Sequence, residues 1–401
     1  MKKYALLLMG AFMALSFATG CSNTAAVEES STTSEVVTEV EETVAEVETL
    51  KVVTTIFPEY DWTREILGEN LANTELIMLL DNGVDLHSYQ ATADDIITIA
   101  DCDLFIYVGG ESDSWVDDAL QNATNPDMIV INLMEVLGDS VKVEESVVGM
   151  QVTEHDHDEE ATTTEEEHDH DEEATTTEEE HDHDEEATTT EEDHDHDEEA
   201  TTTEEEHDHE EESGIVTEAY EHGHDDEHVW LSLANAEIIC NTIASELTAL
   251  DPDNAQMYSD NLTTYLSSLQ VLDTQYEEAV SQAAGNTILV ADRFPYRYLV
   301  DDYTIEYYAA FSGCSAETEA SFETIAFLAT KLDELGLSTV ITTESSDNKI
   351  ADTVIASTIN QDQAILSLNS MQAITSQDVA AGVTYLSIME DNLVVLIEAL
   401  Q

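Results

Sequence analysis

The sequence predicts an α/β fold with two halves, each built on a doubly wound parallel sheet. Three observations support this prediction. Short apolar segments typical of buried strands alternate with segments of helical periodicity, which is the pattern of parallel α/β sheets. An acidic tract without apolar periodicity interrupts the alternation. A long helical pattern over residues 254–285 then separates the first half from the second.

The first half, residues 50–253, contains four expected strands. Each is a short apolar run set between polar or glycine-containing segments. The second strand is followed by a polar loop, and a helix is expected to begin at its end because Thr92 and Asp95 have the spacing of a capping box. The expected strands are 51–56, 74–80, 104–108 and 128–133, and the expected helices are 62–67, 92–100 and 231–250.

The acidic tract lies inside the first half, at residues 150–224. A unit of 13 residues, His-Asp-His-Asp-Glu-Glu-Ala-Thr-Thr-Thr-Glu-Glu-Glu, recurs there with small variations. Its one alanine offers no apolar face to bury, and a run of like charge is the usual signature of disorder. The tract is therefore interpreted as a disordered loop.

The second half, residues 286–401, follows the linking helix. Gly285 is expected to end that helix, because glycine is the preferred residue just beyond a helix C-terminus. The strand pattern then resumes. The expected strands are 287–291, 305–311, 339–343 and 364–368, and the expected helices are 322–335, 347–359 and 383–400.

The charge balance restricts the classes of partner. Asp and Glu number 91 against 9 Lys and Arg, which gives a formal net charge of −82. A surface this acidic repels nucleic acid and anionic lipid headgroups, and it concentrates cations. The composition excludes nucleic acid as a partner and favours a cationic ligand.

The N-terminus predicts export. Lys2 and Lys3 precede an apolar stretch too short to span a bilayer comfortably, so residues 1–20 are expected to be a signal peptide. Small residues directly before Cys21 resemble the cleavage site of bacterial lipoproteins, which implies lipidation on Cys21 and anchoring to the outside of the cell membrane. A plain secretory signal with a chance cysteine is the alternative. Residues 21–49 are then a flexible tether.

Three further cysteines, Cys102, Cys240 and Cys314, are widely spaced and form no CxxC motif. An exported compartment permits disulfides, and an odd count leaves at least one thiol over. The sequence does not pair them, so one bridge and three small buried residues both remain open.

Two histidines stand outside the tract and its edge. His87 lies in the loop after the second expected strand, at the carboxyl end where open α/β sheets bind ligands. His228 directly precedes the helix 231–250. A lone histidine is more often a hydrogen-bonding residue than a ligand. Two of them in an otherwise histidine-free fold, beside a histidine-rich tract, favour a transition-metal site, since neutral imidazole suits Zn²⁺, Cu²⁺ or Ni²⁺.

Two motifs carry a resemblance to a known family. Residues 83–89 (Gly-Val-Asp-Leu-His-Ser-Tyr) and 226–231 (Asp-Glu-His-Val-Trp-Leu) resemble the two histidine motifs of the zinc/manganese ABC-transporter substrate-binding proteins, the cluster A-I metal receptors. The resemblance covers residues 50–401 and includes the histidine-rich insertion before the second motif. It implies two α/β lobes joined by a long rigid helix, with the metal held in the cleft between the lobes.

The resemblance leaves the other ligands open. Family members have a third ligand after the first strand of the second lobe, His in zinc proteins and Glu in manganese proteins. Asp292 falls nearest to that position, with Arg293 beside it. Pairing of Asp292 with Arg293, or capping of a turn, is the alternative. The Asp that manganese proteins carry before the final helix would fall at Val383 or Thr384. Neither is a carboxylate, which argues against manganese.

A fourth ligand is sought among the remaining acids. Glu344, directly after the strand 339–343, is the first choice, and Asp85, Glu317, Glu319 or water are alternatives. The predicted metal ligands are therefore His87, His228, Asp292 and Glu344.

The histidines of the tract predict an accessory role. A flexible chain wraps an ion with ligands from several units, so the tract is expected to capture or buffer zinc and to raise its concentration near the cleft. A solvated acidic spacer is the alternative. The accessory residues are His155, His157, His168, His170, His181, His183, His194, His196, His207, His209, His222 and His224.

Together these features predict a monomeric, lipid-anchored, extracytoplasmic receptor that delivers Zn²⁺ to the permease of an ABC importer and is not an enzyme. A manganese receptor of the same family, and a surface zinc-buffering or adhesion lipoprotein without a transporter, are the alternatives. A zinc hydrolase requires a general base beside an open coordination position. Glu227 adjoins His228, but no HExxH cluster exists.

Overall fold

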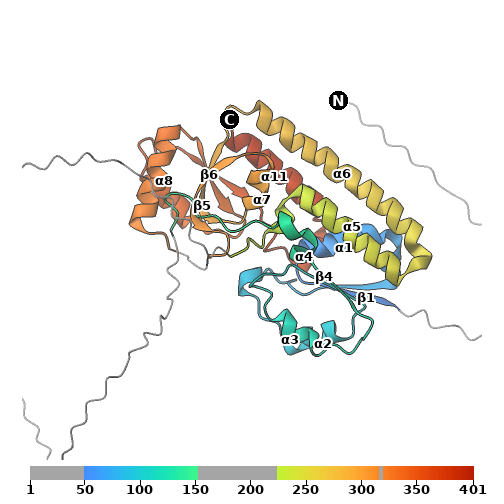
Figure 1. The fold of residues 1–401 in the computed structure, drawn as a ribbon. Helices are drawn as coiled ribbons and strands as arrows, with labels where there is room; N and C mark the ends of the chain where they lie inside the picture. Colours follow the sequence, from blue (N-terminus) through green and yellow to red (C-terminus); the bar gives the residue numbers. More distant parts are fainter. Residues whose placement is uncertain (1–48, 152–223, 316–318) are drawn as a thin grey trace, which may run out of the picture. The chain divides into compact units, whose positions relative to one another are not determined.

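The computed structural model describes residues 49–151, 224–315 and 319–401 (Figure 1). The expected signal peptide and Cys21, the tether up to residue 48, the histidines from His155 to His222, and Glu317 lie outside the described residues. Within the described ranges, no helix has both the length and the apolar character that a membrane span requires.

The core of each lobe is a parallel sheet of four strands. The strand order is β2-β1-β3-β4 in the first lobe and β6-β5-β7-β8 in the second, so the two lobes share one topology. All pairings within both sheets are parallel. The first sheet contains β1 (Leu50–Thr54), β2 (Thr74–Met78), β3 (Leu104–Tyr107) and β4 (Ile129–Asn132). The second contains β5 (Thr287–Phe294), β6 (Glu306–Ser312), β7 (Thr339–Thr343) and β8 (Ala364–Leu368).

The predicted fold class is confirmed, including two lobes and a long helix. The inner strands are largely buried because helices cover both faces of a parallel sheet. Val52 and Val53 of β1 are fully buried, and all of β7 is buried. Strand β5 is longer than expected: it continues past residue 291 to Phe294, with an irregular register between Val290 and Arg293.

The helices agree with the expected pattern except for the short ones. Helix α1 begins at Phe57, earlier than expected, because Pro58 fits the first turn of a helix. Thr92 caps α2 through the predicted capping box with Asp95. The short helices α3, α4, α7 and α10 were not predicted. The helices are α1 (Phe57–Leu67), α2 (Ala93–Ala100), α3 (Val116–Leu120), α4 (Leu133–Leu137), α5 (Leu233–Leu250), α6 (Ala255–Gln282), α7 (Arg297–Asp302), α8 (Phe322–Leu335), α9 (Lys349–Ala356), α10 (Ser376–Ala381) and α11 (Tyr385–Ala399).

Helix α6 connects the lobes and packs on both of them. It lies beside α1 and α5 of the first lobe and beside α11 at the end of the second (Figure 1). Its buried side chains recur at helical spacing, as in Tyr265, Leu269, Leu272 and Tyr276. Burying one such leucine contributes about 1.5–3 kcal/mol. The apolar stripe of α6 thus stabilises the arrangement of both lobes.

The lobes also touch directly. Asp61 of α1 accepts a hydrogen bond from the backbone N–H of Tyr385, the first residue of α11, at 2.8 Å. The rings of Trp62 and Tyr385 meet edge to face. Trp230, within the second histidine motif, donates to the Ser370 carbonyl of the second lobe at 2.9 Å. These contacts hold the second motif against the second lobe.

The segment before the acidic tract crosses to the second lobe. Gln151 forms a parallel bridge with Phe311 of β6, and its N–H donates to the Ala310 carbonyl at 2.9 Å. After the undescribed residues, Asp225 pairs with Val143 in an antiparallel bridge. Residues 225–228 therefore lie beside this crossing segment, close to the end of β6.

Candidate metal centre

His87 and His228 come together, as predicted. His87 lies in a short 3₁₀ helix, Leu86–Ser88, that follows β2, and its own N–H is capped by the Asp85 carboxylate at 3.0 Å. His228 is fully buried directly before the 3₁₀ helix Val229–Leu231. Their Nε2 atoms are 3.2 Å apart although the residues are 141 positions apart in the chain.

Acceptors face the other nitrogen of each imidazole. Nδ1 of His228 lies 2.9 Å from Oδ1 of the buried Asp226. Nδ1 of His87 lies 2.8 Å from the Ser112 hydroxyl and 3.4 Å from Oε2 of Glu227. A carboxylate beside Nδ1 assigns the proton to that nitrogen and leaves Nε2 with a lone pair.

Two lone pairs therefore point at each other across 3.2 Å. They repel unless a cation lies between them. Two imidazole nitrogens that are each about 2.0–2.1 Å from a tetrahedral Zn²⁺ are about 3.3–3.4 Å apart. The pair consequently has the separation of a zinc site, and the acceptors at both Nδ1 atoms favour the tautomers that metal binding requires.

Glu227 is held in place by the backbone of the first lobe. It is 3 % exposed, and its Oε1 accepts the Ser112 N–H at 2.8 Å. Burial alone would raise the pKa of Glu227, but the interactions with His87 and Ser112 outweigh it and the pKa is lowered. Its Oε2 is buried without a hydrogen bond that meets ordinary geometry. Because this oxygen faces Nδ1 of His87, the carboxylate orients the imidazole and does not face its Nε2.

Two glycines make room for these groups. A Cβ on Gly110 would lie 2.3 Å from Oε1 of Glu227, and the φ of Gly110 is +83°. A Cβ on Gly313 would lie 2.9 Å from Cε1 of His228 and 2.9 Å from the Phe294 carbonyl oxygen. A larger residue would displace Glu227 at the first position and His228 at the second.

A third metal-binding side chain lies beside the histidines. The ligand atoms of His87, His228 and Cys314 are all within 4.8 Å of one another. Cys314 follows Gly313 just after β6, and its N–H donates to Glu144 at 3.0 Å. Burial raises the pKa of its thiol, and the nearby carboxylates of Glu144, Asp226 and Glu227 raise it further.

Cys314 was not among the predicted ligands. A single cysteine between glycine and serine has no ligand spacing in the sequence, and only the fold brings the end of β6 to the histidines. Cys102, Cys240 and Cys314 are all free thiols, and the first two are buried. The sequence left open whether two of these three cysteines form a disulfide, and the structure shows none among them.

The structure does not bring Asp292 and Glu344 into this group. Asp292 accepts the N–H of Arg293 at 2.8 Å and the hydroxyl of Thr343 at 3.1 Å. Both oxygens of Glu344 accept hydrogen bonds from Ser370 at 2.9 Å. The two carboxylates are thus bound within the second lobe, and their role as ligands stays a prediction.

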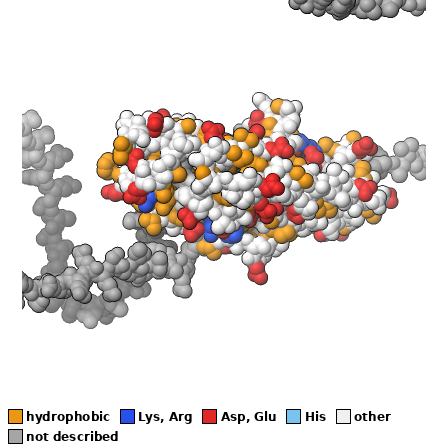
Figure 2. Space-filling model, turned by 90° about the horizontal axis from the view of Figure 1, so that it is seen from above, with side chains coloured by type: hydrophobic (Ala, Val, Ile, Leu, Met, Phe, Trp, Pro, Cys, Tyr) orange, Lys and Arg blue, Asp and Glu red, His pale blue; other side chains and the backbone are white. Residues whose placement is uncertain are grey.

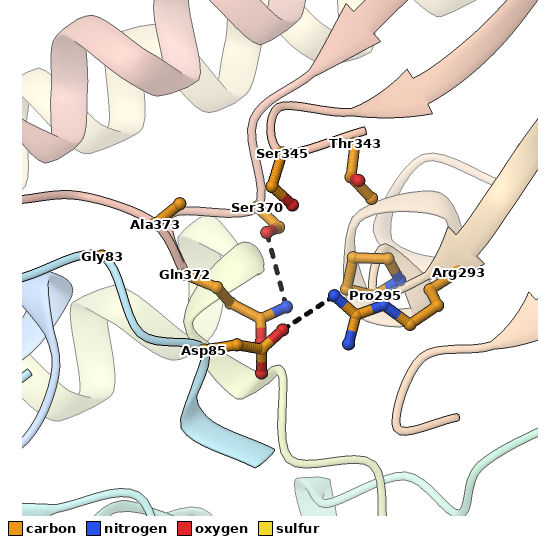
Figure 3. Close-up of a pocket in the computed structure, with 9 residues that line it drawn as sticks. All are labelled: Gly83, Asp85, Arg293, Pro295, Thr343, Ser345, Ser370, Gln372 and Ala373. Atoms are coloured by element: carbon orange, nitrogen blue, oxygen red, sulfur yellow. Dashed lines mark hydrogen bonds and ion pairs between the residues drawn. The ribbon is translucent and has the colours of Figure 1, made fainter. Parts of the chain in front are cut away.

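Asp85 and Arg293 face each other between the lobes. They form an ion pair at 2.8 Å and line a polar pocket together with second-lobe residues such as Thr343, Ser370 and Gln372 (Figure 3). Neither histidine lines this pocket. Arg293 therefore links the second lobe to the loop that carries His87, and it leaves Asp85 engaged outside the histidine pair.

The visible surface and the end of the tract both carry acidic groups. Acidic side chains are scattered over the face seen in Figure 2, with few basic groups among them. His224, the accessory histidine that the structure describes, lies 3.0 Å from Glu111 in an exposed ion pair. The described end of the histidine-rich tract is therefore acidic as well.

Two α/β lobes with an imidazole pair where they meet define a two-lobed binding protein with a candidate metal site. Comparison with protein families identifies this class more narrowly. The chain belongs to the family described as zinc-uptake complex component A, periplasmic, whose model matches residues 52–399. The resemblance inferred from the two histidine motifs is thereby confirmed.

Known relatives are zinc proteins by name. The zinc-binding lipoprotein AdcA of Streptococcus pneumoniae is 26% identical over 351 residues, which are 86% of this chain and 54% of that protein. The high-affinity zinc uptake system protein ZnuA of Bacillus subtilis is 25% identical over 352 residues, 88% of each chain. The chain thus spans about half the length of AdcA and most of ZnuA.

A solved structure confirms the fold. The Zn(II)-bound ZnuA-like domain of Streptococcus pneumoniae AdcA superposes with a TM-score of 0.57 and 21% identity, covering 88% of this chain and 99% of that chain. The two-lobe architecture is therefore shared with a domain that has been solved with zinc.

Proposed function

We propose that this protein is an extracytoplasmic receptor that binds Zn²⁺ and delivers it to the permease of an ABC importer. The observation that carries the proposal is the histidine pair, whose Nε2 atoms are 3.2 Å apart while each Nδ1 faces an acceptor. The names of AdcA and ZnuA as zinc-binding and zinc-uptake proteins support it.

Zinc is preferred to manganese in this proposal. Imidazole suits Zn²⁺ better than Mn²⁺, which favours oxygen ligands. Val383 and Thr384 stand where the manganese proteins of the family carry an acid, and Thr384 caps α11 with its hydroxyl. The second lobe therefore offers no carboxylate from that position.

The proposed receptor holds its ion without a catalytic step. A zinc hydrolase needs a general base directed at a metal-bound water. Glu227 is the carboxylate adjacent to the second histidine, and its Oε2 faces Nδ1 of His87. Its position suits the orientation of a ligand rather than proton abstraction from water.

Lipidation on Cys21, a monomeric state and zinc capture by the tract histidines belong to the same proposal. Anchoring at the membrane surface would keep the receptor near its permease. A tract with histidines in every unit would exchange zinc quickly, because each site is weak, and would lose it as imidazoles protonate below about pH 6.

Zinc uptake by intact cells tests the function. A strain that lacks this protein is expected to accumulate less zinc from zinc-poor medium, and the wild-type chain should restore uptake while His87→Ala should not. The matched control is Cys102→Ala, which alters a buried side chain of the first lobe outside the histidine pair. Unchanged zinc uptake in the deletion strain would instead support a zinc-buffering or adhesion lipoprotein.

A further inference from the structure

We propose that the thiolate of Cys314 is the third ligand of the zinc ion, so that the second lobe contributes sulfur to the site. This inference rests on the proposed zinc-receptor function and specifies how its site is completed. The resemblance to the family implies a histidine, glutamate or aspartate from this lobe. The geometry points to a different residue, on a different strand.

The first argument is proximity. Among the described residues, His87, His228 and Cys314 form the one group of three His, Cys, Asp or Glu side chains whose ligand atoms are close enough to share an ion. In a tetrahedral zinc site with Zn–N of about 2.0–2.1 Å and Zn–S of about 2.3 Å, sulfur and nitrogen are about 3.6 Å apart. In the structure the three ligand atoms lie within 4.8 Å of one another, so a small side-chain movement would bring them to that separation.

The second argument is how the backbone positions the thiol. Gly313 packs against the ring of His228, since a Cβ on it would lie only 3.2 Å from Nδ1. The backbone therefore passes close to the imidazole. The next residue, Cys314, is fixed by its N–H bond to Glu144 at 3.0 Å. A turn follows, in which Ser315 N–H donates to the Ser312 carbonyl. Cys314 is thus held beside His228 by backbone contacts on either side.

The third argument is that the competing carboxylates are engaged elsewhere. Asp292 is bound to Thr343, Glu344 to Ser370, and Asp85 to Arg293. Moving any of them to the histidines would break bonds that hold the second lobe or its link to the first. The thiol of Cys314 requires no such rearrangement.

A sulfur ligand changes which ions the receptor selects. Thiolate favours Zn²⁺ and softer ions such as Cd²⁺ and Cu⁺, whereas Mn²⁺ prefers oxygen ligands. Zinc binding would form a Zn–S bond and release the thiol proton, with no oxidation or reduction. The other reading of Cys314 is a half-buried small residue that binds no metal.

Cobalt spectroscopy separates these two readings. The chain from Thr49 onward forms one compact unit, and the acidic tract within it contains no cysteine. One equivalent of Co²⁺ is added to the wild type and to Cys314→Ala, Cys314→Ser and Cys102→Ala. We expect a sulfur-to-cobalt charge-transfer band in the near ultraviolet for the wild type and Cys102→Ala, and none for either variant at 314.

Zinc affinity and folding complete the test. The affinity of both 314 variants for Zn²⁺ is expected to fall at least about tenfold, and Cys102→Ala should bind as the wild type does. Circular dichroism of the zinc-free proteins identifies a variant that does not fold, in which case the other 314 variant decides. A sulfur band that persists without Cys314, or a wild type that binds one Co²⁺ tightly without such a band, overturns the proposal.

The failure of this inference is distinct from failure of the proposed function. If His87→Ala and His228→Ala abolish tight binding but the wild type shows no sulfur band, the zinc receptor stands and Cys314 is not a ligand. If neither histidine variant weakens binding, the histidine site itself is wrong, and the thiol proposal falls with it.

Discussion

The two lobes have the same strand order but supply the site with different chemistry. In the first lobe, the chain leaves the edge strand β2 and forms a 3₁₀ helix that presents an imidazole, His87. In the second lobe, it leaves the corresponding edge strand β6 and presents a thiol, Cys314, directly after a glycine. Equivalent strand ends therefore lead to the same site with nitrogen on one side and sulfur on the other.

The lobes also differ in what their carboxylates do. Asp226 and Glu227, on the segment that returns to the first lobe, face the Nδ1 atoms of the two histidines. Asp292 and Glu344 of the second lobe bind hydroxyl and N–H groups of their own lobe. The comparison teaches that a shared topology fixes where loops meet, while the residues at the strand ends decide which of them can bind a metal.

Replacing His228 by alanine is expected to cause the largest loss of zinc affinity. It removes the fully buried imidazole that we propose as a ligand. We expect zinc affinity to fall by more than about 100-fold, because even the loss of an outer partner of a ligand costs about 10- to 100-fold. Titration calorimetry measures the effect. Cys102→Ala is the control, since it is a buried side chain of the same lobe outside the histidine pair, and an equal loss of affinity there would contradict the assignment.

Replacing Gly313 by alanine tests how closely the second lobe approaches the histidine. The added methyl group would lie 2.9 Å from both His228 and the Phe294 carbonyl, so the ring must move. Zinc affinity is expected to fall by about tenfold or more, and the melting temperature should drop as well. Gly285→Ala is the control, since its nearest neighbour is 4.0 Å away. Equal affinities for the two variants would argue against close packing at Gly313.

Glu227→Gln tests the carboxylate of the first lobe without changing its size. The amide oxygen can still accept the Ser112 N–H, but the amide nitrogen would face Nδ1 of His87 and oppose its proton. Zinc affinity should fall by about 10-fold. Isothermal titration at constant pH checks this. Unaltered affinity would show that the charge of Glu227 does not orient the ligand.

Asp61→Asn has the smallest expected effect, a change in how folding stability depends on pH. It probes the contact between the lobes. Burial raises the pKa of Asp61 to about 6, partly offset by Arg64. Because the folded protein holds this proton more strongly than the unfolded chain, stability declines as pH rises from about 4 to about 6 and then levels off.

The amide variant cannot titrate, so this part of the pH dependence should disappear. Urea unfolding of both proteins between pH 4 and pH 8 measures it. We expect the stability of Asp61→Asn relative to the wild type to rise between about pH 4 and pH 6 and to stay constant above that range. A difference that does not depend on pH would contradict the burial of a protonated carboxyl.

Much of the fold could be predicted because buried strands have an unmistakable apolar pattern. Strands 339–343 and 364–368 were predicted at their observed bounds. Short helices such as α3 and α10 were missed, since five or six residues are too few to show a helical period. Strand β5 was predicted too short, because Asp292 and Arg293 interrupt its apolar run although the strand continues through them.

The site could be predicted in part. His87 and His228 carry motifs whose neighbours, Asp85 and Asp226, are visible in the sequence, and the structure brings the two histidines together. Asp292 was chosen for its place after the expected strand, but it lies within β5 and turns toward Thr343 of β7. Cys314 had no signal, because its neighbours in space are far away in the chain.

Zinc titration of the chain from Leu50 onward, with and without Glu154 to Glu212, tests the central claim most directly. One tight zinc site that survives removal of the tract, and is lost in His87→Ala or His228→Ala, is the predicted result. If deletion of the tract removed all tight binding, the site between the lobes would be wrong, and the protein would be a zinc-buffering surface protein.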